Sequence, residues 1–271
     1  MGVDKVIGFI GSGNMATAMI GGLIQSNLFS NEAIIVSNPN KSSLIKLEEQ
    51  YGVQTVTDSV CLAKQAKIII LAVKPTVYPK VISEIKDYIS EETIIISIAA
   101  GQSIANIESL FNKKIKLVRT MPNTPAFVLE AMSAIIPNEH VTEEELNEVI
   151  QIFNSFGKCE VIQESMIDAF IAVSGSSPAY IYLIIEAMAD AAVLQGMPRE
   201  QAYRLASQAV LGSAKMVLET KKHPGQLKDE VCSPGGTTIE AVASLEESGV
   251  RSSIIKAMNV CAMKSKTMSK S

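Results

Sequence analysis

The segment 233–241, SPGGTTIEA, places two glycines and two threonines before an amphipathic run that predicts a helix. A helix that begins with glycine leaves its first N–H groups unpaired, and the helix dipole makes that end positive. Such a helix start can hold an anion without any charged side chain. The candidate binding residues are Ser233, Gly235, Gly236, Thr237 and Thr238. Because Thr237 and Glu240 also fit the S/T-x-x-E capping box, a purely structural helix cap is the alternative.

A second glycine loop, Gly11-Ser12-Gly13-Asn14-Met15-Ala16, lies between the apolar run VIGFI and the helical pattern MATAMIGGLI. In a GxGxxA loop, Gly11 allows the tight turn and Gly13 allows a pyrophosphate to approach the backbone. Ala16 allows the helix to lie close to the strand. The loop therefore predicts dinucleotide binding at Gly11, Ser12, Gly13, Asn14 and Met15, and an ordinary structural turn is the alternative.

The next apolar run ends in AIIVSNPNK, where an NAD-specific fold usually places a carboxylate against the ribose 2′-hydroxyl. Ser37, Asn38, Asn40 and Lys41 stand there instead. Small polar groups with one cation suit a 2′-phosphate, which a carboxylate would repel. We therefore expect NADPH as cofactor with NADH possible, and assign Ser37, Asn38 and Lys41 to its binding. A solvated turn with a surface lysine is the alternative.

The elements that position these loops follow from hydrophobic periodicity. From residue 5 to about 161, β-branched runs alternate with helical stretches, and the runs are apolar on both faces. This pattern indicates an α/β fold, a parallel sheet with helices on both sides. The predicted strands are 6–10, 33–37, 67–73, 93–99, 115–119 and 133–137.

After residue 163 the strand pattern ends, and three long stretches rich in Ala, Met, Leu and Ile predict helices at 177–195, 199–220 and 249–270. We therefore predict a dinucleotide-binding domain at 1–163 and an all-helical domain at 164–271. Helices this apolar are expected to bury a face against a second subunit. The alternative is that they pack only on their own sheet domain.

Composition excludes several other classes of protein. The chain has 271 residues and a net charge of −4, which gives no electrostatic footprint for nucleic acid or an anionic membrane. Two distant histidines and four widely spaced cysteines show no metal-ligand spacing. The start MGVDKVIGFIG lacks the pattern of a secretory signal, and the apolar stretch 179–194 contains two acids and falls short of a membrane span. We expect a cytoplasmic protein without metal.

Five segments together resemble the pyrroline-5-carboxylate reductase family over essentially the whole chain. They are LAVKP at 71–75, MPNTP at 121–125, SGSSPAY at 174–180, HPGQLKDEV at 223–231 and SPGGTTIEA. The resemblance implies NAD(P)H-dependent reduction of 1-pyrroline-5-carboxylate to proline. It also implies a Rossmann domain followed by a helical domain that interlocks two subunits, often within a decamer.

The resemblance adds further candidate cofactor residues, namely Ser59, Ala72, Val73, Lys74, Pro75, Ala100 and Asn123. It places MPNTP near the nicotinamide end, although its two prolines also suit a stiff turn and Lys74 also suits a solvated strand end. Three positions depart from the family pattern. Ser59 stands where Asn is usual, Lys67 where Asp is usual, and Ala131 where Gly is usual.

The chemistry fits a chain without an obvious acid and base pair. A ketone needs a proton donor as hydride arrives, whereas a protonated cyclic imine already carries the charge that hydride neutralises. We expect the N–H groups of Gly236, Thr237 and Thr238 to hold the substrate carboxylate. In the family the second threonine lies nearest the reacting ring, so Thr238 is the catalytic candidate, orienting the imine through its hydroxyl.

Two other functions compete with this interpretation. Hydroxyacid dehydrogenases also join a Rossmann domain to a helical one, but they depend on a lysine in the first long helix, and residues 178–195 contain none. A protein that senses NADP(H) without turning it over would have little use for a second anion-binding loop. Turnover of pyrroline-5-carboxylate distinguishes a reductase from such a sensor.

Overall fold

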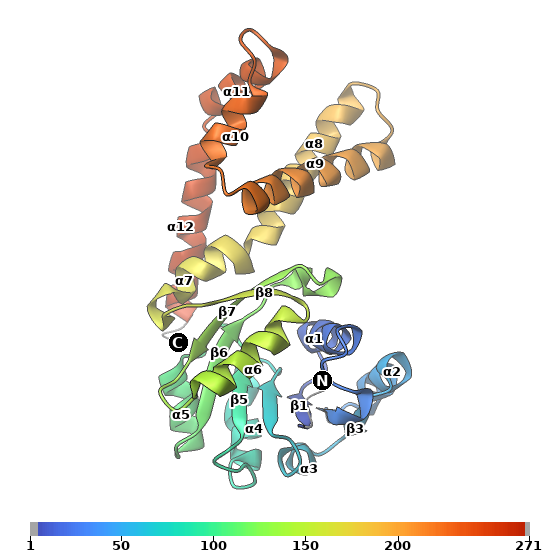
Figure 1. Cartoon of the computed structure of the whole chain (residues 1–271), viewed down its shortest axis with the longest axis vertical. Helices are drawn as coiled ribbons and strands as arrows, with labels where there is room; N and C mark the ends of the chain where they lie inside the picture. Colours follow the sequence, from blue (N-terminus) through green and yellow to red (C-terminus); the bar gives the residue numbers. More distant parts are fainter. Residues whose placement is uncertain (1–4, 269–271) are drawn as a thin grey trace. The chain divides into compact units, whose positions relative to one another are not determined.

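The computed structural model describes residues 5–268, and an eight-stranded sheet forms its N-terminal part (Figure 1). The strand order is β3-β2-β1-β4-β5-β6-β7-β8. The strands are β1 (Ile7–Ile10), β2 (Ile34–Ser37), β3 (Gln54–Val56), β4 (Ile68–Leu71), β5 (Ile94–Ser97), β6 (Lys116–Met121), β7 (Ala131–Pro137) and β8 (Gly157–Val161). The chain order reverses between β1 and β4, which is the switch point at which doubly wound α/β folds bind ligands.

Strands β1 to β6 run parallel, as predicted. The helices beside the sheet are α1 (Asn14–Gln25), α2 (Lys41–Tyr51), α3 (Ser59–Ala63), α4 (Tyr78–Ile85), α5 (Ile104–Phe111) and α6 (Glu143–Asn154). Strand β7 differs from the all-parallel expectation, because it is antiparallel to β6. The short connection between them cannot carry a crossover, which needs about a dozen residues or more. Helix α6 then returns the chain, so that β8 is parallel to β7.

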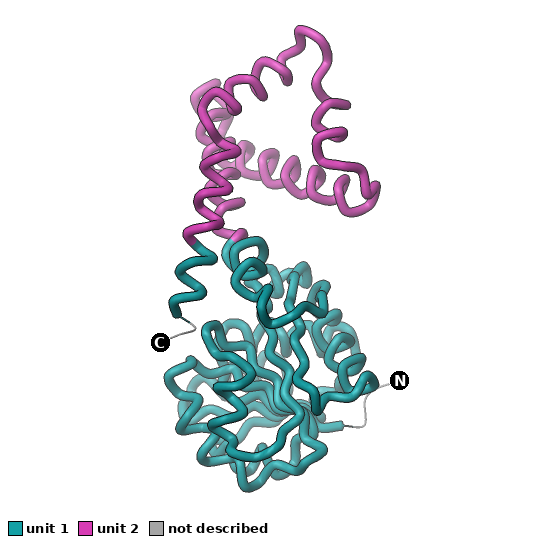
Figure 2. Tube along the Cα trace, turned by 90° about the vertical axis from the view of Figure 1, so that its left-hand side faces the viewer, with its two compact units in different colours: residues 1–176, 261–271 teal, residues 177–260 magenta. Residues whose placement is uncertain are grey.

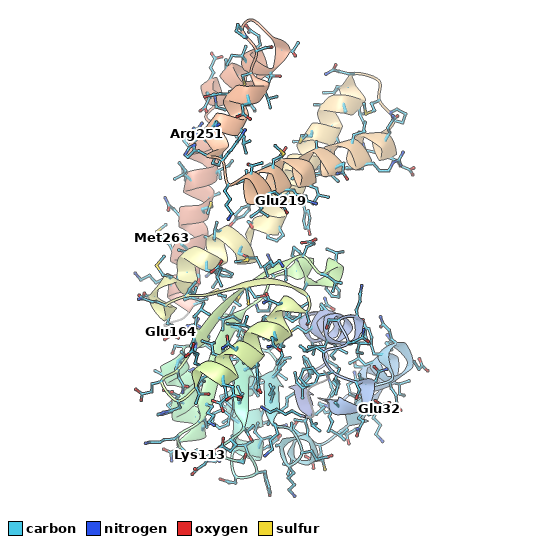
Figure 3. The ribbon with its side chains drawn as sticks, viewed as in Figure 1. Glu32, Lys113, Glu164, Glu219, Arg251 and Met263 are labelled. Carbon is cyan, nitrogen blue, oxygen red and sulfur yellow. The ribbon has the colours of Figure 1, made fainter. Side chains whose placement is uncertain are left out.

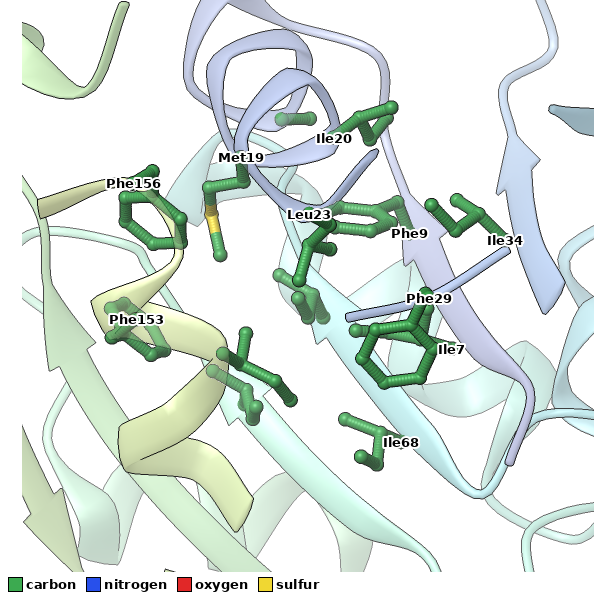
Figure 4. Close-up of a cluster of buried hydrophobic side chains, with 14 of the residues drawn as sticks. Ile7, Phe9, Met19, Ile20, Leu23, Phe29, Ile34, Ile68, Phe153 and Phe156 are labelled. Carbon is green, nitrogen blue, oxygen red and sulfur yellow. The ribbon is translucent and has the colours of Figure 1, made fainter. Parts of the chain in front are cut away.

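The core lies on both faces of the sheet, and neighbouring residues of each strand enter opposite layers. Ile7 and Phe9 of β1 lie in one layer with Met19 and Leu23 of α1 and with Phe153 of α6 (Figure 4). The other layer contains the alternate strand residues and the buried faces of α3, α4 and α5; its members include Ile10, Leu62, Ile69, Leu71, Ile82, Ile85, Ile95 and Phe111. This two-sided burial explains why the strand sequences are apolar throughout.

The described chain divides into two compact units, coloured teal and magenta in Figure 2. Unit 1 contains residues 5–176 and 261–268, and unit 2 contains residues 177–260. Besides the sheet, unit 1 holds the single turns η1 (Asn31–Ala33), η2 (Pro75–Val77), η3 (Thr124–Val128) and η4 (Glu164–Met166), helix α7 (Ile167–Phe170) and the π-helical turn η5 (Ile171–Gly175). The end of α12 (Val250–Met268) belongs to unit 1, where the Ser265 hydroxyl donates to Asp168 Oδ1 at 2.6 Å.

Unit 2 has almost no core of its own. It consists of α8 (Ser177–Leu194), α9 (Arg199–Thr220), α10 (Pro224–Val231), α11 (Thr237–Glu247) and the first part of α12. Of residues 177–260, only Ala189, Ala202 and Ala206 are buried. Large apolar side chains remain exposed on every helix, including Tyr182, Leu183, Leu194, Leu211, Leu218, Val231, Leu245 and Ile255. So little buried apolar surface cannot offset the entropy of ordering the unit, so it needs a partner surface.

The long helices at 177–195 and 199–220 are confirmed almost to the residue, and the third runs to Met268 within the described part, its last two predicted residues lying outside it. The helical segments from Glu164 to Leu194 together form one run that is long and apolar enough to cross a membrane by length and composition, with a mean hydropathy of 1.3 over an 18-residue window. From the sequence, the apolar stretch 179–194 was expected to fall short of a membrane span. That expectation considered too few residues, because the helical run already begins at Glu164. Glu186 and Asp190 lie within this run, and Asp190 pairs with Arg199 of α9.

Candidate active site

The loop after β1 has the geometry of a dinucleotide-binding turn. Gly11 has φ +110°, and a Cβ on it would lie 2.5 Å from the Ala72 carbonyl oxygen, so only glycine fits. Its N–H donates to the Ser37 carbonyl at 2.8 Å. Gly13 caps α1 without a side-chain bond, and a Cβ there would meet nothing within 4 Å. The first turn of α1 therefore presents unpaired N–H groups to open space, as an anion site requires.

A cleft of about 590 Å³ opens at this edge of the sheet. Nine of the predicted cofactor residues line it, namely Gly11, Ser12, Gly13, Ser37, Asn38, Ser59, Ala72, Val73 and Lys74. Four loops that are separate in the sequence thus meet there, because parallel strands end at a common edge. The other six predicted residues, Asn14, Met15, Lys41, Pro75, Ala100 and Asn123, lie outside its lining.

The polar residues after β2 form a network with one another. Ser37 Oγ lies 2.7 Å from Ser59 Oγ, and the Asn38 amide donates to Ser12 Oγ at 2.6 Å. Ser37 is 1 % exposed, so its hydroxyl is committed to Ser59, whereas Asn38 is half-buried. Lys41 begins α2, is exposed and lines an adjoining hollow of about 480 Å³ that shares Thr57 and Asp58 with the cleft. Asn38 keeps a second amide hydrogen beside its bond to Ser12, and Lys41 carries a cation, so these two side chains are the candidates to meet a phosphate.

A buried tyrosine holds the start of the loop after β4 in place. The Tyr78 hydroxyl lies 2.9 Å from both the Leu71 carbonyl and Ser97 Oγ, at the ends of β4 and β5. Burial raises the pKa of Tyr78 far above its usual value, so the phenol stays neutral and acts as an anchor. Ala72 and Val73 line the cleft above it, and the exposed Lys74 caps η2 at Pro75.

Asn123 and Ala100 follow β6 and β5, at the same edge of the sheet. The Asn123 amide donates to the Ser174 carbonyl at 3.1 Å and to Ser174 Oγ at 3.2 Å, and its oxygen accepts from the Met132 N–H at 3.0 Å. These bonds occupy both amide hydrogens. Ala100 lies in the half-exposed turn before α5. Neither residue contacts the cleft by its side chain.

The glycine-threonine loop lies in unit 2 and begins α11. Gly236, with no side-chain bond, is the N-cap, and Thr237 and Thr238 are the first two helical residues. The capping-box alternative is therefore wrong: Thr237 stands one position too late to cap. Gly235 takes the left-handed conformation, with φ +67°, that lets the chain turn into the helix.

One of the N–H groups predicted to bind the substrate carboxylate already has a hydrogen-bond partner within the loop. The Gly236 N–H donates to the Ser233 carbonyl at 3.0 Å, which closes the turn before the helix. The unpaired N–H groups at the helix start are those of Thr237, Thr238 and Ile239, because the first turn has no preceding carbonyls. Ser233 lies against the turn, and its Oγ would be 2.3 Å from a Cβ on Gly236.

Several residues of the cleft were not predicted from the sequence. They are Ile10, Pro39, Thr57, Asp58, Val77, Lys80, Val81 and Glu84. Thr57 and Asp58 follow β3, a short edge strand with polar residues that lacks a hydrophobic signal. Lys80 and Glu84 lie on α4, where their four-residue spacing suggests only an ordinary surface pair.

The three residues that depart from the family pattern lie in different parts of unit 1. Ser59 is the first residue of α3, which Asp58 caps, and its hydroxyl bonds Ser37. Lys67 precedes β4 at the opposite edge of the sheet and is exposed. Ala131 begins β7 and is buried in the core.

Neither histidine lines the cleft. His223 caps α10, and its Nδ1 accepts from the Gly225 N–H at 3.0 Å. His140 lies 3.8 Å from Glu139, in the connection between β7 and α6. Within residues 5–268 no cluster of three His, Cys, Asp or Glu side chains could hold a metal ion.

The fold and the glycine loop define the class of protein, a Rossmann-type oxidoreductase that binds a nicotinamide dinucleotide. Residues 6–101 match a family model described as NADP oxidoreductase, coenzyme F420-dependent. Residues 164–268 match one described as pyrroline-5-carboxylate reductase dimerisation.

Whole-chain comparisons narrow this class. The chain is 50% identical over 269 residues to pyrroline-5-carboxylate reductase of Escherichia coli, covering 99% of this chain and 100% of that protein. It resembles the structure of a pyrroline-5-carboxylate reductase from Coxiella burnetii, with a TM-score of 0.93, 38% identity and coverage of 99% and 100% of the two chains. The Plasmodium falciparum enzyme, crystallised with NADP bound, gives a TM-score of 0.90 and 33% identity, with coverage of 99% and 100%. The chain belongs to the pyrroline-5-carboxylate reductase family.

Proposed function

We propose that this protein reduces 1-pyrroline-5-carboxylate to L-proline with NADPH, and with NADH as the weaker cofactor. The observation that carries this proposal is the similarity to the Escherichia coli enzyme, which is 50% identical over 269 residues, or 99% of this chain, a span in which both glycine loops lie. Each loop supplies what one reactant needs: an open helix start for a pyrophosphate and a second helix start for a carboxylate.

Residues of unit 1 fit the cofactor. The open space in front of Gly13 and the unpaired N–H groups of α1 suit the pyrophosphate. Asn38 and Lys41 suit a 2′-phosphate, because no carboxylate follows β2 and a cation stands nearby. When bound, the reduced nicotinamide supplies a hydride for the imine carbon. Ala72, Val73 and Lys74 form the wall of the cleft on the far side of β1 from β2.

Residues of unit 2 fit the substrate. The N–H groups of Thr237, Thr238 and Ile239 bind the carboxylate at the positive end of α11. The Thr238 hydroxyl orients the ring nitrogen and hydrogen-bonds the amine as it forms. Ser233, Gly235 and Gly236 shape the turn that carries these donors. No general acid is required, because the protonated imine already carries the charge that hydride neutralises.

The assembly follows from the exposed helices of unit 2. A dimerisation region covers 164–268, and its apolar side chains need a second chain. We propose a homodimer, with a decamer as the larger assembly, in the cytoplasm, without membrane or nucleic-acid partners.

A turnover assay tests this function. Purified protein is mixed with pyrroline-5-carboxylate and either NADPH or NADH, and the loss of reduced-nicotinamide absorbance is followed. We expect turnover with both cofactors and a higher kcat/KM with NADPH. A protein that binds NADPH but consumes none with this substrate would be a nucleotide sensor, and the proposal would be wrong.

A further inference from the structure

Asn123 makes a closed ring of hydrogen bonds between three distant segments. Its amide donates to both oxygens of Ser174, and its oxygen accepts from the Met132 N–H. The Ser174 hydroxyl completes the ring by donating to the Met132 carbonyl at 3.1 Å. The ring joins the loop after β6, the start of β7 and the π-helical turn η5. Asn123 and Ser174 are only 8 % and 6 % exposed, so these bonds form in a buried site where they are strong.

The sequence explains why Ser174 presents its carbonyl to Asn123. The residue four positions after Ser174 is Pro178, which has no N–H and whose ring would clash with that carbonyl in a regular helix. The chain instead forms a π turn, in which the Ser176 N–H donates to the Ile171 carbonyl at 2.8 Å. The motifs MPNTP and SGSSPAY thus meet through the carboxamide of Asn123, which is 51 residues from Ser174 in the sequence. Such π turns are frequent at functional sites.

A second, partly buried contact joins β6 itself to the segment 164–176. Arg119 of β6 is 3 % exposed, and its Nη1 donates to Glu164 Oε1 at 2.7 Å. That oxygen also accepts from the Ile104 N–H at 2.8 Å, at the start of α5. Glu164, labelled in Figure 3, begins the region that matches the dimerisation family. The loops after β5 and β6 are therefore both braced against residues 164–176.

The position of the braced loop follows from the sheet order. The 2′ end of the cofactor is assigned to the end of β2 and the pyrophosphate to the end of β1. A dinucleotide that crosses the switch point places its second half toward β4, β5 and β6. Residues 121–124 lie at the end of β6 on that side, and η3, which begins at Thr124, packs against α1.

We propose that Asn123 is a positioning residue for the reaction and makes no cofactor contact through its side chain. It holds the peptide groups of residues 121–124 in place for the nicotinamide half of the cofactor, using the π turn as its support. This inference rests on the proposed function, since it assigns the loop a place in the reduction reaction.

The test compares Asn123→Ala with Asn138→Ala. Asn138 is a matched control: it is 9 % exposed, and its amide donates to Glu108 Oε1 at 2.8 Å and to the Ile115 carbonyl at 2.9 Å, at the other end of β6. Steady-state kinetics well below both melting temperatures should show kcat reduced roughly ten- to a hundredfold in Asn123→Ala, with KM for NADPH changed less than about threefold. Asn138→Ala should keep the wild-type kcat despite a lower melting temperature.

Two measurements without turnover support the comparison. In the free protein, Asn123→Ala should speed hydrogen exchange of the Met132 amide, which loses its acceptor, while Asn138→Ala should not. The affinity for 2′-phospho-ADP-ribose, which lacks the nicotinamide, should be unchanged in both variants. Ser174→Ala removes only the hydroxyl contacts and should show the same pattern more weakly if Asn123→Ala does not fold.

The outcomes separate the two proposals. If wild-type protein does not reduce pyrroline-5-carboxylate, the proposed function fails, whereas unchanged Met132 exchange in Asn123→Ala overturns the bracing itself. If the wild type is active but Asn123→Ala mainly weakens NADPH affinity, the side chain is a cofactor contact. If both Ala variants retain wild-type kcat, the ring is structural only. Either of the last two results overturns the positioning role.

Discussion

Replacing Asn38 by aspartate should shift the cofactor preference away from NADPH and toward NADH. Asn38 stands at the end of β2, where a carboxylate would accept a bond from the ribose 2′-hydroxyl of NADH and repel the 2′-phosphate of NADPH. The substitution is nearly isosteric. One oxygen of the new carboxylate could accept from the Asn40 N–H, as Asn38 Oδ1 does now at 2.8 Å, and the Ser12 hydroxyl could donate to the other oxygen. The fold should therefore survive.

The size of the effect follows from Coulomb's law. One charge about 5 Å from the phosphate costs about 0.8 kcal/mol in water and about 3 kcal/mol at an effective dielectric constant of 20. NADPH should thus lose about 1 to 3 kcal/mol of binding, or roughly five- to 150-fold in affinity. Ser37 is a poorer site for this test, because it is 1 % exposed and an aspartate there would bury a charge beside Ser59.

The assay is kcat/KM for each cofactor at saturating substrate, beside a direct binding titration. Asn147→Asp adds the same charge on the exposed face of α6 and serves as the control. The ratio of NADPH to NADH efficiency should fall in Asn38→Asp and stay unchanged in the control. An unchanged ratio in Asn38→Asp would show that the 2′-phosphate does not lie at the end of β2.

Three further predictions concern the substrate loop, acid stability and assembly. Thr238→Ala should lower kcat about ten- to a hundredfold with little change in KM. Thr237→Ala removes no helix cap and should change the free energy of unfolding by no more than about 0.5 kcal/mol. Steady-state kinetics and melting curves of both variants check these expectations, and an equal loss of kcat in the two variants would refute a special role for Thr238. Burial alone would raise the pKa of Glu145, but hydrogen bonds from Lys116, at 2.6 Å, and from Thr142 hold it below its usual value. That contribution to stability is present above the ordinary carboxyl pKa and is lost as pH falls through the lowered one. Glu145→Gln, which keeps the capping box, should therefore cost about 1 kcal/mol at neutral pH and progressively less as the pH falls below the ordinary carboxyl pKa, as urea unfolding over a series of pH values would show. Analytical ultracentrifugation should find a dimer or larger at the lowest measurable concentration, and an active monomer would contradict the role given to unit 2.

Most of the fold could be predicted because its signals are local. β-branched runs marked the central strands, and the helix 199–220 lies between Pro198 and Pro224, which interrupt the helical pattern. The edge strands β3 and β8 were not recognised as separate strands, because they are short and partly exposed and carry no apolar run. The reversal of β7 depends on the length of a loop rather than on any residue in the strand.

The candidate site was predictable only where function depends on the backbone. Gly11 and Gly13 could be assigned because a conformation or an open approach requires glycine. The role of Asn123 could not be read from its neighbours, since its partners lie 9 and 51 residues away. The Gly236 N–H was assigned to the substrate, but a local turn uses it. The domain boundary after residue 163 stays a prediction.

The most direct test of the proposed function follows the transferred hydrogen. NADPH carrying deuterium on the transferred side of C4 is incubated with pyrroline-5-carboxylate and the purified protein, and the product is analysed by mass spectrometry and NMR. The proposed reaction predicts L-proline with a single deuterium on C5 and one NADPH consumed for each proline formed. Proline without deuterium, or NADPH oxidised without proline, would contradict direct hydride transfer to the imine.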